Sequence, residues 1–285
     1  MPILNQGALY TVVATPDGFN LHTESGGSGT TVVFVHEFNG SCRSFDLQRD
    51  AFRPRHRCVA FNARGYPPSD VPEAVASYSQ EHATADIAAV FDGLGLERAH
   101  LVGVSMGAAS ALQFALAQPA RVISATLVGI GTGSDDPEQF RATALETAAF
   151  IESSGMAAHA EKTAEAPTRW RMREKNPAEY RRFVEQLSAK SGKGAANTMR
   201  GVQAGRPPLY VHAQRIAAMR LPVLVMVGAE DGGCVRPSEF LGRTLPGSRL
   251  VVVPSAGHAL NQEEPELFNR TCLEFIADVD AARAR

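Results

Sequence analysis

Short apolar runs alternate with helical patterns along much of the chain. Residues 30–35 read TTVVFV, a nearly continuous apolar run typical of a strand buried on both faces. Runs of the same form lie at residues 57–64, 100–105, 122–131, 223–231 and 249–257. Apolar residues at helical spacing predict helices between these runs, over residues 80–94, 106–117, 237–245 and 265–277. This alternation predicts the α/β class, with a mostly parallel sheet flanked by helices.

The sheet is expected to begin with an antiparallel pair of strands. Two candidate strands, at residues 10–15 and 19–26, flank the dipeptide Asp17-Gly18. This dipeptide is a strong hairpin signal because both residues tolerate the backbone angles that a tight turn needs. With the six parallel runs, the pair brings the predicted sheet to eight strands.

An insertion interrupts the strand and helix rhythm in the second half of the chain. The apolar runs at 122–131 and 223–231 are separated by far more than the roughly 2–6 residues of an ordinary connection in this class. Asp136 before Pro137 predicts a helix start, and Gly155 predicts its end. Asn176-Pro177 predicts the start of a second helix, with Gly192 after its end. We therefore expect a first core part at residues 1–134, a helical cap at 135–216 and a second core part at 217–285.

The composition gives no indication of a nucleic-acid or membrane partner. The chain has 285 residues and a net charge of −2, so it lacks the excess positive charge that is typical of proteins that bind nucleic acid or an anionic membrane. No apolar run approaches the roughly 20 residues needed to span a bilayer, and the first residues lack the pattern of a signal peptide. A cytoplasmic protein that binds a small-molecule substrate is expected, and its oligomeric state is left open.

The four cysteines predict neither a disulfide framework nor a metal site. Cys42, Cys58, Cys234 and Cys272 lie far apart in the sequence and form no C-x-x-C pair. We expect buried free thiols, no bound metal and no cofactor.

The stretch Gly103-Val104-Ser105-Met106-Gly107 places a serine where a predicted strand becomes a helix. A sharp turn there would lift the hydroxyl of Ser105 above the sheet, and the glycines would allow close backbone packing. The helix that starts at Met106 would also present unpaired N–H groups to a developing oxyanion. Ser105 is therefore the candidate nucleophile.

A serine nucleophile needs a base, and the base needs an acid to orient it. His258 lies in a glycine-bearing loop directly after the last apolar run. Asp231 and Glu230 follow the preceding run. Asp231 is favoured as the acid because it lies three residues beyond Gly228, where the chain has left the strand. Glu230 is the alternative.

By these residues the chain resembles the α/β-hydrolase family, in which nucleophile, acid and histidine come in this order. The resemblance spans essentially the whole chain and includes the position of the cap. The segment His36-Glu37-Phe38-Asn39-Gly40-Ser41 is similar to the family's His-Gly-x-x-Gly oxyanion segment. The resemblance implies that the backbone N–H groups of Phe38 and Met106 form the oxyanion hole.

Glu37 departs from the family pattern, which has glycine at this position. Its side chain either hydrogen-bonds within the loop or lines the pocket beside His36 and biases substrate choice. The segment Asn62–Asp70 is similar to the family's R-G-x-G-x-S segment, with Arg64 and Gly65 retained. Its expected role is to brace the loop.

The cap segment TRWRMREK offers three arginines whose role the sequence leaves open. Arg169, Arg171 and Arg173 could clamp a substrate carboxylate, but alternating charges are more often a solvated face. Trp170 and Met172 could turn inward as an apolar lid surface, which makes Trp170 a candidate pocket residue.

These observations lead to one main hypothesis and two alternatives. The main hypothesis is a serine hydrolase that cleaves a carboxylic ester, lactone or related acyl compound through an acyl-enzyme on Ser105. A carbon–carbon bond hydrolase of a dienoic diketone-type acid would use the same triad but would need a pocket-facing arginine for the substrate carboxylate. A ligand sensor with slow turnover is the third reading. Epoxide hydrolases and haloalkane dehalogenases of this fold use an aspartate where this chain has Ser105.

Overall fold

The computed structural model describes residues 9–284, which include an eight-stranded sheet. The strands are β1 (Leu9–Ala14), β2 (Asn20–Gly26), β3 (Thr30–Val35), β4 (His56–Phe61), β5 (Ala99–Val104), β6 (Val122–Val128), β7 (Val223–Gly228) and β8 (Arg249–Val253). Their order across the sheet is β1-β2-β4-β3-β5-β6-β7-β8. Strands β3 to β8 pair in parallel, whereas β1 pairs antiparallel with β2, and β2 with β4. The predicted fold class, the opening antiparallel pair and the number of strands are confirmed.

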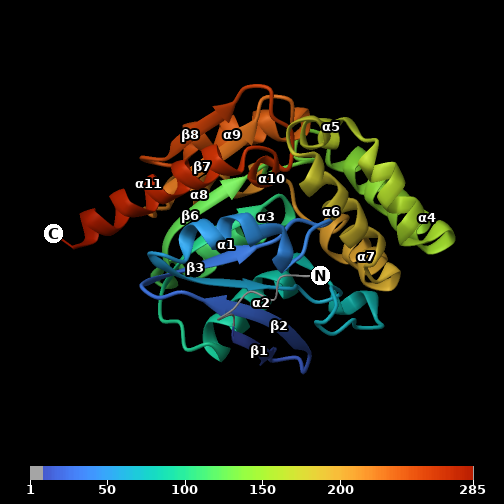
Figure 1. Ribbon diagram of the computed structural model, residues 1–285, viewed down its shortest axis with the longest axis horizontal. Helices are drawn as coiled ribbons and strands as arrows, with labels where there is room; N and C mark the ends of the chain where they lie inside the picture. Colours follow the sequence, from blue (N-terminus) through green and yellow to red (C-terminus); the bar gives the residue numbers. More distant parts are fainter. Residues whose placement is uncertain (1–8, 285) are drawn as a thin grey trace.

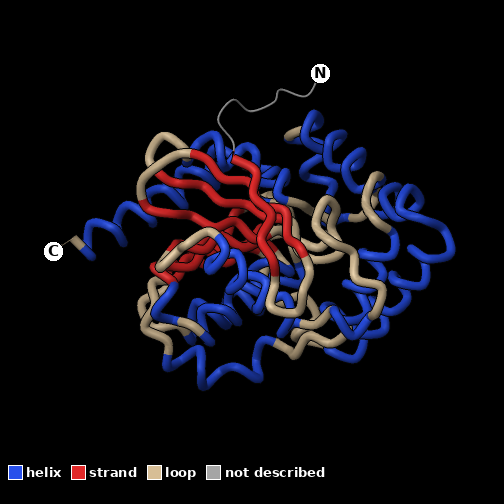
Figure 2. Tube along the Cα trace, turned by 90° about the horizontal axis from the view of Figure 1, so that it is seen from below, coloured by secondary structure: helices blue, strands red, loops and turns tan. Residues whose placement is uncertain are grey.

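Helices cover both faces of the sheet, as Figure 2 shows from below. One face carries α2 (Gln80–Gly93), α3 (Met106–Ala117), α8 (Ala213–Ala218) and α9 (Gly232–Thr244). The other face carries α1 (Asp46–Phe52), α10 (Leu260–Glu263) and α11 (Pro265–Arg283). Strand β3 shows why both faces are apolar: Val33 packs in the first layer and Phe34 in the second, because successive side chains of a strand point to opposite faces.

Four helices form the insertion between β6 and β7: α4 (Pro137–Ala164), α5 (Pro167–Lys175), α6 (Pro177–Ser188) and α7 (Gly192–Thr198). They are followed by a short π-helix, η4 (Met199–Gln203). We call α4 to α7, with the turns between them, the cap. Figures 1 and 2 both show the cap gathered beyond one end of the strands. Its apolar side chains form a third cluster that also includes Phe38 and Met106 of the core.

The predicted cap helices are present, with local differences. Asp136 accepts from the N–H of Gln139 and caps α4, and Asn176 caps α6 in the same way. Gly155 was expected to end the first helix, and its backbone does leave the helical region, with φ of 81°. The helix resumes directly after it, because Gly155 absorbs the kink at no steric cost.

Two predictions for the core helices need correction. The helix expected at 237–245 begins earlier, at Gly232, with Pro237 inside it. The carbonyl of Asp231 accepts from the N–H groups of Cys234 and Val235 and so begins the helix five residues before the proline. Helices α1, α5, α7, α8 and α10 were not predicted, because each has fewer than ten residues and shows too little periodicity.

Within residues 9–284, no helix combines the length and the apolar character that crossing a membrane requires.

Candidate active site

Ser105 lies in a sharp turn between β5 and α3, where the sequence predicts it. Its φ of 54° is rare for a residue with a side chain. A Cβ on Gly103 would lie 2.6 Å from the carbonyl oxygen of Gly107, and a Cβ on Gly107 would lie 2.0 Å from that of Val35. Neither approach leaves room for a side chain, so both glycines are required by packing. The strained turn persists because the surrounding sheet and helix fix it.

His258 and Asp231 lie together beyond the ends of β8 and β7. Nδ1 of His258 is 2.7 Å from Oδ2 of Asp231. The side chain of Asp231 is 4% exposed and that of His258 is 13% exposed, so the pair is shielded but the imidazole keeps some access. This geometry fits an Nδ1–H that donates to the carboxylate, which leaves Nε2 free to accept a proton.

The two groups shift each other's pKa. Burial alone lowers the pKa of His258, but the charge of Asp231 and the hydrogen bond to it raise that pKa well above 6.5. Burial alone raises the pKa of Asp231, but the charge of His258 and the same hydrogen bond hold it below 3.8. The pair is therefore arranged to stabilise an imidazolium beside a carboxylate.

Gly129, which the sequence analysis did not single out, connects this pair to Ser105. The N–H of Ser105 donates to the carbonyl of Val128, at 2.8 Å, and Gly129 follows directly. A Cβ on Gly129 would lie 3.2 Å from Oδ2 of Asp231 and 3.3 Å from Nδ1 of His258. A glycine with φ of 55° directly after a buried strand is the local signal that could have pointed to it.

Glu230, the alternative acid, faces away from His258. Its carboxylate is 43% exposed and pairs with Arg171 of α5, with Oε1 at 2.6 Å from Nη2. Of the two adjacent carboxylates, Asp231 is the one that contacts the imidazole.

The two residues expected at the oxyanion hole are buried beside the cap. Met106 is the first residue of α3, so its N–H lacks a partner within the helix. Phe38 lies in the loop that follows β3, residues 36–41, which we call the β3 loop. The carbonyl of Phe38 accepts a hydrogen bond of 2.8 Å from the hydroxyl of Tyr66. Both residues belong to the apolar cluster that also contains Ala259, the neighbour of His258.

His36 supports the β3 loop from the core side. Its Nε2 lies 3.1 Å from the N–H of Ala63 and accepts from it, so Nδ1 carries the proton and donates to the carbonyl of Glu37 at 2.7 Å. Burial lowers the pKa of His36 to about 4, which keeps the ring neutral. The geometry of His36 is that of a structural bridge.

Glu37 forms a contact that was not considered from the sequence alone. Its buried carboxylate forms an ion pair with Arg169 of the cap helix α5. Burial is the largest single influence on the pKa of Glu37 and raises it, but the charges of Arg169, His258 and Lys190 and the hydrogen bond to Arg169 together lower that pKa below 4.5. Sequence reasoning could not reach this contact because the two residues are 132 positions apart.

The other side chains of α5 divide between the interior and the surface. Arg171 and Arg173 form ion pairs at the surface, as expected for a solvated helix face. Arg169, in contrast, is only 2% exposed. Met172 is buried, but Trp170 is 57% exposed. The inward orientation considered for Trp170 is therefore wrong. Two residues apart on a helix differ in direction by about 200°, so Trp170 and Met172 cannot share one face.

Arg64 braces the loop after β4, as expected. Its guanidinium donates to Asp86 at 2.6 Å and 2.8 Å and to Asp17 at 2.7 Å. The N–H of Gly65, with φ of 87°, donates to the carbonyl of Asp70 at 2.8 Å. This network ties the loop to the first hairpin and to α2.

The four cysteines are buried free thiols in the structure. Cys234, near the candidate base, was not singled out by the sequence analysis as a site residue. Its Sγ lies 3.9 Å from Nδ1 of His258 and 3.1 Å from the carbonyl of Gly129. Asp231, Cys234 and His258 thus form a group with three potential metal-ligand atoms. Because Asp231 already accepts from His258, the group fits a hydrogen-bonded pair better than a metal centre.

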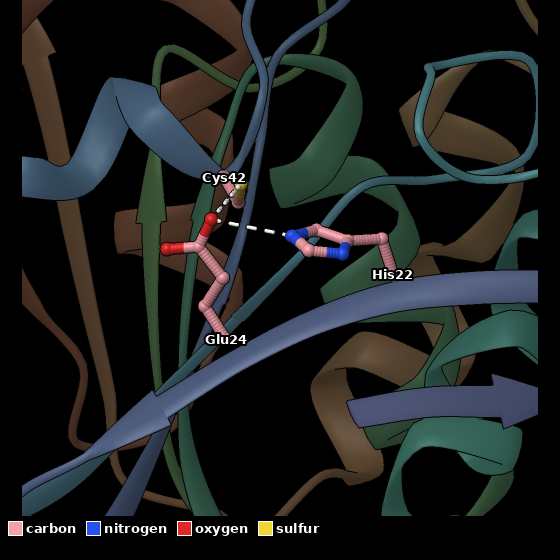
Figure 3. Close-up of side chains that lie close together, drawn as sticks. All are labelled: His22, Glu24 and Cys42. Atoms are coloured by element: carbon pink, nitrogen blue, oxygen red, sulfur yellow. Dashed lines mark hydrogen bonds and ion pairs between the residues drawn. The ribbon is translucent and has the colours of Figure 1, made fainter. Parts of the chain in front are cut away.

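A second group of three potential metal ligands lies on the core at β2 and the start of the 3₁₀-helix η1 (Cys42–Phe45). Figure 3 shows His22 and Cys42 on two sides of the Glu24 carboxylate, at 3.3 Å and 3.5 Å from its Oε1. Arg49 also donates to Glu24 at 2.6 Å, and Arg43 lies 3.3 Å from it. Two guanidinium groups already neutralise this carboxylate, so the local charge opposes a divalent cation.

The chain is similar in sequence to known hydrolases over most of its length. A family described as "alpha/beta hydrolase fold" matches residues 30–265. The chain is 25% identical to 3-oxoadipate enol-lactonase 1 of Acinetobacter baylyi, over 87% of this chain and 89% of that protein. It is 28% identical to a 2-hydroxy-6-oxononadienedioate/2-hydroxy-6-oxononatrienedioate hydrolase of Burkholderia vietnamiensis, over 91% and 92% of the two chains.

A solved structure extends the likeness to the whole fold. A thermophilic esterase from Thermogutta terrifontis matches with a TM-score of 0.85 and 25% identity, over 95% of this chain and 99% of that one. The matched family, the sheet with its inserted helices and the related hydrolases agree, and the chain belongs to the α/β-hydrolase family.

Proposed function

We propose that the protein is a serine hydrolase that cleaves a carboxylic ester or lactone through an acyl-enzyme. In this proposal Ser105 is the nucleophile, His258 the general base and Asp231 the acid that orients it. The backbone N–H groups of Phe38 and Met106 form the oxyanion hole. The observation that carries the proposal is the buried His258–Asp231 pair. This pair lies against Gly129, which directly follows Val128, and the carbonyl of Val128 accepts from the N–H of Ser105.

Acylation begins when Nε2 of His258 takes the hydroxyl proton of Ser105. The serine oxygen forms a bond to the substrate carbonyl carbon, and the carbonyl electron pair moves to its oxygen, where the two backbone N–H groups stabilise it. When this intermediate collapses, the bond to the leaving oxygen breaks, and His258 returns the proton to that oxygen. An alcohol and an acyl-Ser105 result.

Deacylation repeats these steps with water as the nucleophile. His258 takes a proton from water, and the water oxygen bonds to the acyl carbon. When this second intermediate collapses, the bond between the acyl carbon and the oxygen of Ser105 breaks, and His258 returns the proton to that oxygen. The products are a carboxylic acid and free serine. In a lactone the alcohol and acyl groups belong to one molecule, so the product is a hydroxy acid.

Among the arginines of α5, the pairing of Arg169 favours ester or lactone hydrolysis over carbon–carbon bond cleavage. The latter reaction, as considered from the sequence, needs an arginine that is free to bind a substrate carboxylate. Arg169 is the buried arginine of α5; Glu37 compensates its charge through Nη2, while its Nε and Nη1 have no hydrogen-bond partner among the described residues. The exposed Arg171 pairs with Glu230 and Glu174 instead.

The nucleophile can be tested with a fluorophosphonate probe and an activated ester. Wild-type protein should be labelled at Ser105 and should turn over many equivalents of ester, whereas Ser105→Ala should lose both labelling and turnover with an unchanged circular dichroism spectrum. Ser153→Ala, at an exposed position of α4, serves as the control and should behave as wild type. Turnover by Ser105→Ala would refute the proposal. A single turnover in wild type would indicate a ligand sensor instead.

A further inference from the structure

Different parts of the cap bind three residues of the β3 loop. Arg169 of α5 binds the carboxylate of Glu37, and His159 of α4 lies 3.1 Å from Oδ1 of Asn39. Lys190, between α6 and α7, donates to the carbonyl of Gly40. The cap therefore contacts the residues on both sides of Phe38, whose N–H is proposed for the oxyanion hole.

The core holds the same loop from the opposite side. Tyr66 binds the carbonyl of Phe38. The N–H of Ala63 holds the ring of His36, the first residue of the loop, which in turn binds the carbonyl of Glu37. These core contacts fix two carbonyl groups, but they leave the side chain of Glu37 to the cap. The carbonyl of Glu37 and the N–H of Phe38 share one peptide plane, which the core holds through this carbonyl and the cap holds through the side chain of Glu37.

The contact between Glu37 and Arg169 is a buried charge pair. The two side chains are 5% and 2% exposed, and the guanidinium of Arg169 also lies over the ring of Phe183, at 4.5 Å from its centroid. A buried charge that loses its partner is strongly destabilised, because neither water nor another charge replaces it. The carboxylate of Glu37 therefore keeps its observed position only while α5 is docked on the core.

We propose that Arg169 is a positioning residue that acts through Glu37 to hold the Phe38 N–H in its catalytic position. This inference rests on the proposed function. It links cap docking to catalysis, because displacement of α5 would release Glu37 and disorganise the oxyanion hole. The same helix contacts the loop that carries His258: the N–H of His258 faces the carbonyl of Thr168 at 3.5 Å, and Lys175 donates to the carbonyl of Ser255 at 2.6 Å.

The test compares Glu37→Gln, Arg169→Met and the double variant E37Q/R169M with wild type. A displacement of about 1 Å in a catalytic group can cost about 100-fold in rate, so each single variant should lose about 10- to 100-fold in kcat with an activated neutral ester. KM should change by less than about threefold, because the hole binds the transition state more strongly than the substrate. Labelling by a fluorophosphonate should slow in parallel.

The double variant separates positioning from simple stability. It leaves neither charge of the Glu37–Arg169 pair without its partner, so its melting temperature should recover most of what either single variant loses. Its kcat should nevertheless stay low, because nothing then links the cap to Glu37. A double variant with kcat near wild type would overturn the proposal.

Arg169→Lys and Arg173→Met complete the experiment. Lysine keeps the charge and should restore part of the kcat that methionine loses. Arg173, on the same helix, pairs with Glu165 at the surface, so Arg173→Met should match wild type in kcat. Equal kcat values for Arg169→Met and Arg173→Met would also overturn the inference. Absence of Ser105 labelling in wild type would instead refute the proposed function, so the two failures are distinguishable.

Discussion

Nδ1 of His258 lies 2.7 Å from a carboxylate oxygen of Asp231, and both side chains are largely shielded from solvent. The contact joins loops that follow two neighbouring strands, β7 and β8, and Gly129 after β6 lies against both residues. An imidazole oriented in this way has one nitrogen committed to the acid and the other available for a substrate or nucleophile.

Exchanging the acid for its amide should cripple turnover. Asp231→Asn keeps the size of the side chain but no longer stabilises the imidazolium or selects its tautomer, so kcat should fall by about 10⁴. Glu230→Gln alters a surface ion pair with Arg171 and should cost less than about tenfold. Steady-state kinetics with one activated ester measures the kcat of both variants. A severe loss in Glu230→Gln with an active Asp231→Asn would reverse the assignment of the acid.

The pH profile of kcat/KM should reflect the raised pKa of His258. The base must be neutral to accept the serine proton, so activity should rise with pH through the pKa of His258 in the free enzyme. The charge of Asp231 and its hydrogen bond more than offset burial and raise this pKa well above 6.5. The midpoint should therefore lie well above 6.5. A midpoint at or below 6.5 would contradict the claim that Asp231 raises the pKa of His258.

The pH profile of the residual activity of Asp231→Asn provides a control for the assignment of the raised pKa to His258. Without the carboxylate charge, burial remains and lowers the pKa of His258. The midpoint of the variant should move to lower pH than that of wild type. A single-turnover assay with an activated ester can measure this shift even when turnover is slow, and an unchanged midpoint would assign the wild-type value to another group.

Lys190 should be the most reactive of the four lysines near neutral pH. Burial lowers its pKa to about 7, the charge of Glu37 opposes this shift, and that of Arg169 adds to it. At pH 7.5 an ordinary lysine with a pKa of about 10.4 has only about one amine in a thousand neutral, whereas most of Lys190 would be neutral. The residue also lines a surface cavity of about 400 Å³, which gives a reagent access.

Limited reductive methylation followed by peptide mass spectrometry can rank the lysines. The chain has only Lys162, Lys175, Lys190 and Lys193, so each site is resolved. Glu37→Gln removes the charge that raises the pKa of Lys190 and should increase its methylation rate further at pH 6.5. Equal rates at all four lysines in wild type would contradict the lowered pKa.

Local sequence rules predicted much of the candidate site. The glycines around Ser105 mark the turn because packing leaves no room for a side chain there, and that requirement is visible in five consecutive residues. His258 and Asp231 were found because each follows an apolar run, and parallel strands bring their carboxyl ends to one edge. The pattern of strands likewise predicted the sheet, because two-sided burial produces continuous apolar runs.

Contacts between distant segments could not be read from local patterns. The partner of Glu37 depends on how the cap docks, and alternating arginines in α5 give no indication that only Arg169 turns inward. Trp170 was considered as a lid residue for its chemistry, but helix geometry places Met172 inside and Trp170 at the surface. Short helices such as α1 and α8 were missed because tertiary packing, and not periodicity, stabilises them.

The charges of Glu37 and Arg169 should set the preference between anionic and neutral substrates. In wild type the two charges compensate each other, so we expect little electrostatic discrimination from this pair. Glu37→Gln leaves an unpaired cation near the candidate oxyanion hole, so it should raise the ratio of kcat/KM for a 4-nitrophenyl half-ester of a dicarboxylic acid over that for a neutral 4-nitrophenyl ester of equal length. A unit charge about 10 Å away at an effective dielectric of about 20 corresponds to about 1.7 kcal/mol, or roughly 15-fold.

Arg169→Met should change the same ratio in the opposite direction and in a pH-dependent way. Without the guanidinium, burial raises the pKa of Glu37, so the carboxylate ionises only as the pH increases. Discrimination against the anionic ester should therefore grow with pH. The double variant E37Q/R169M has neither charge and should return to the wild-type ratio even if its kcat is low for both esters. If all three variants keep the wild-type ratio, the pair lies too far from the bound acyl group to influence substrate choice.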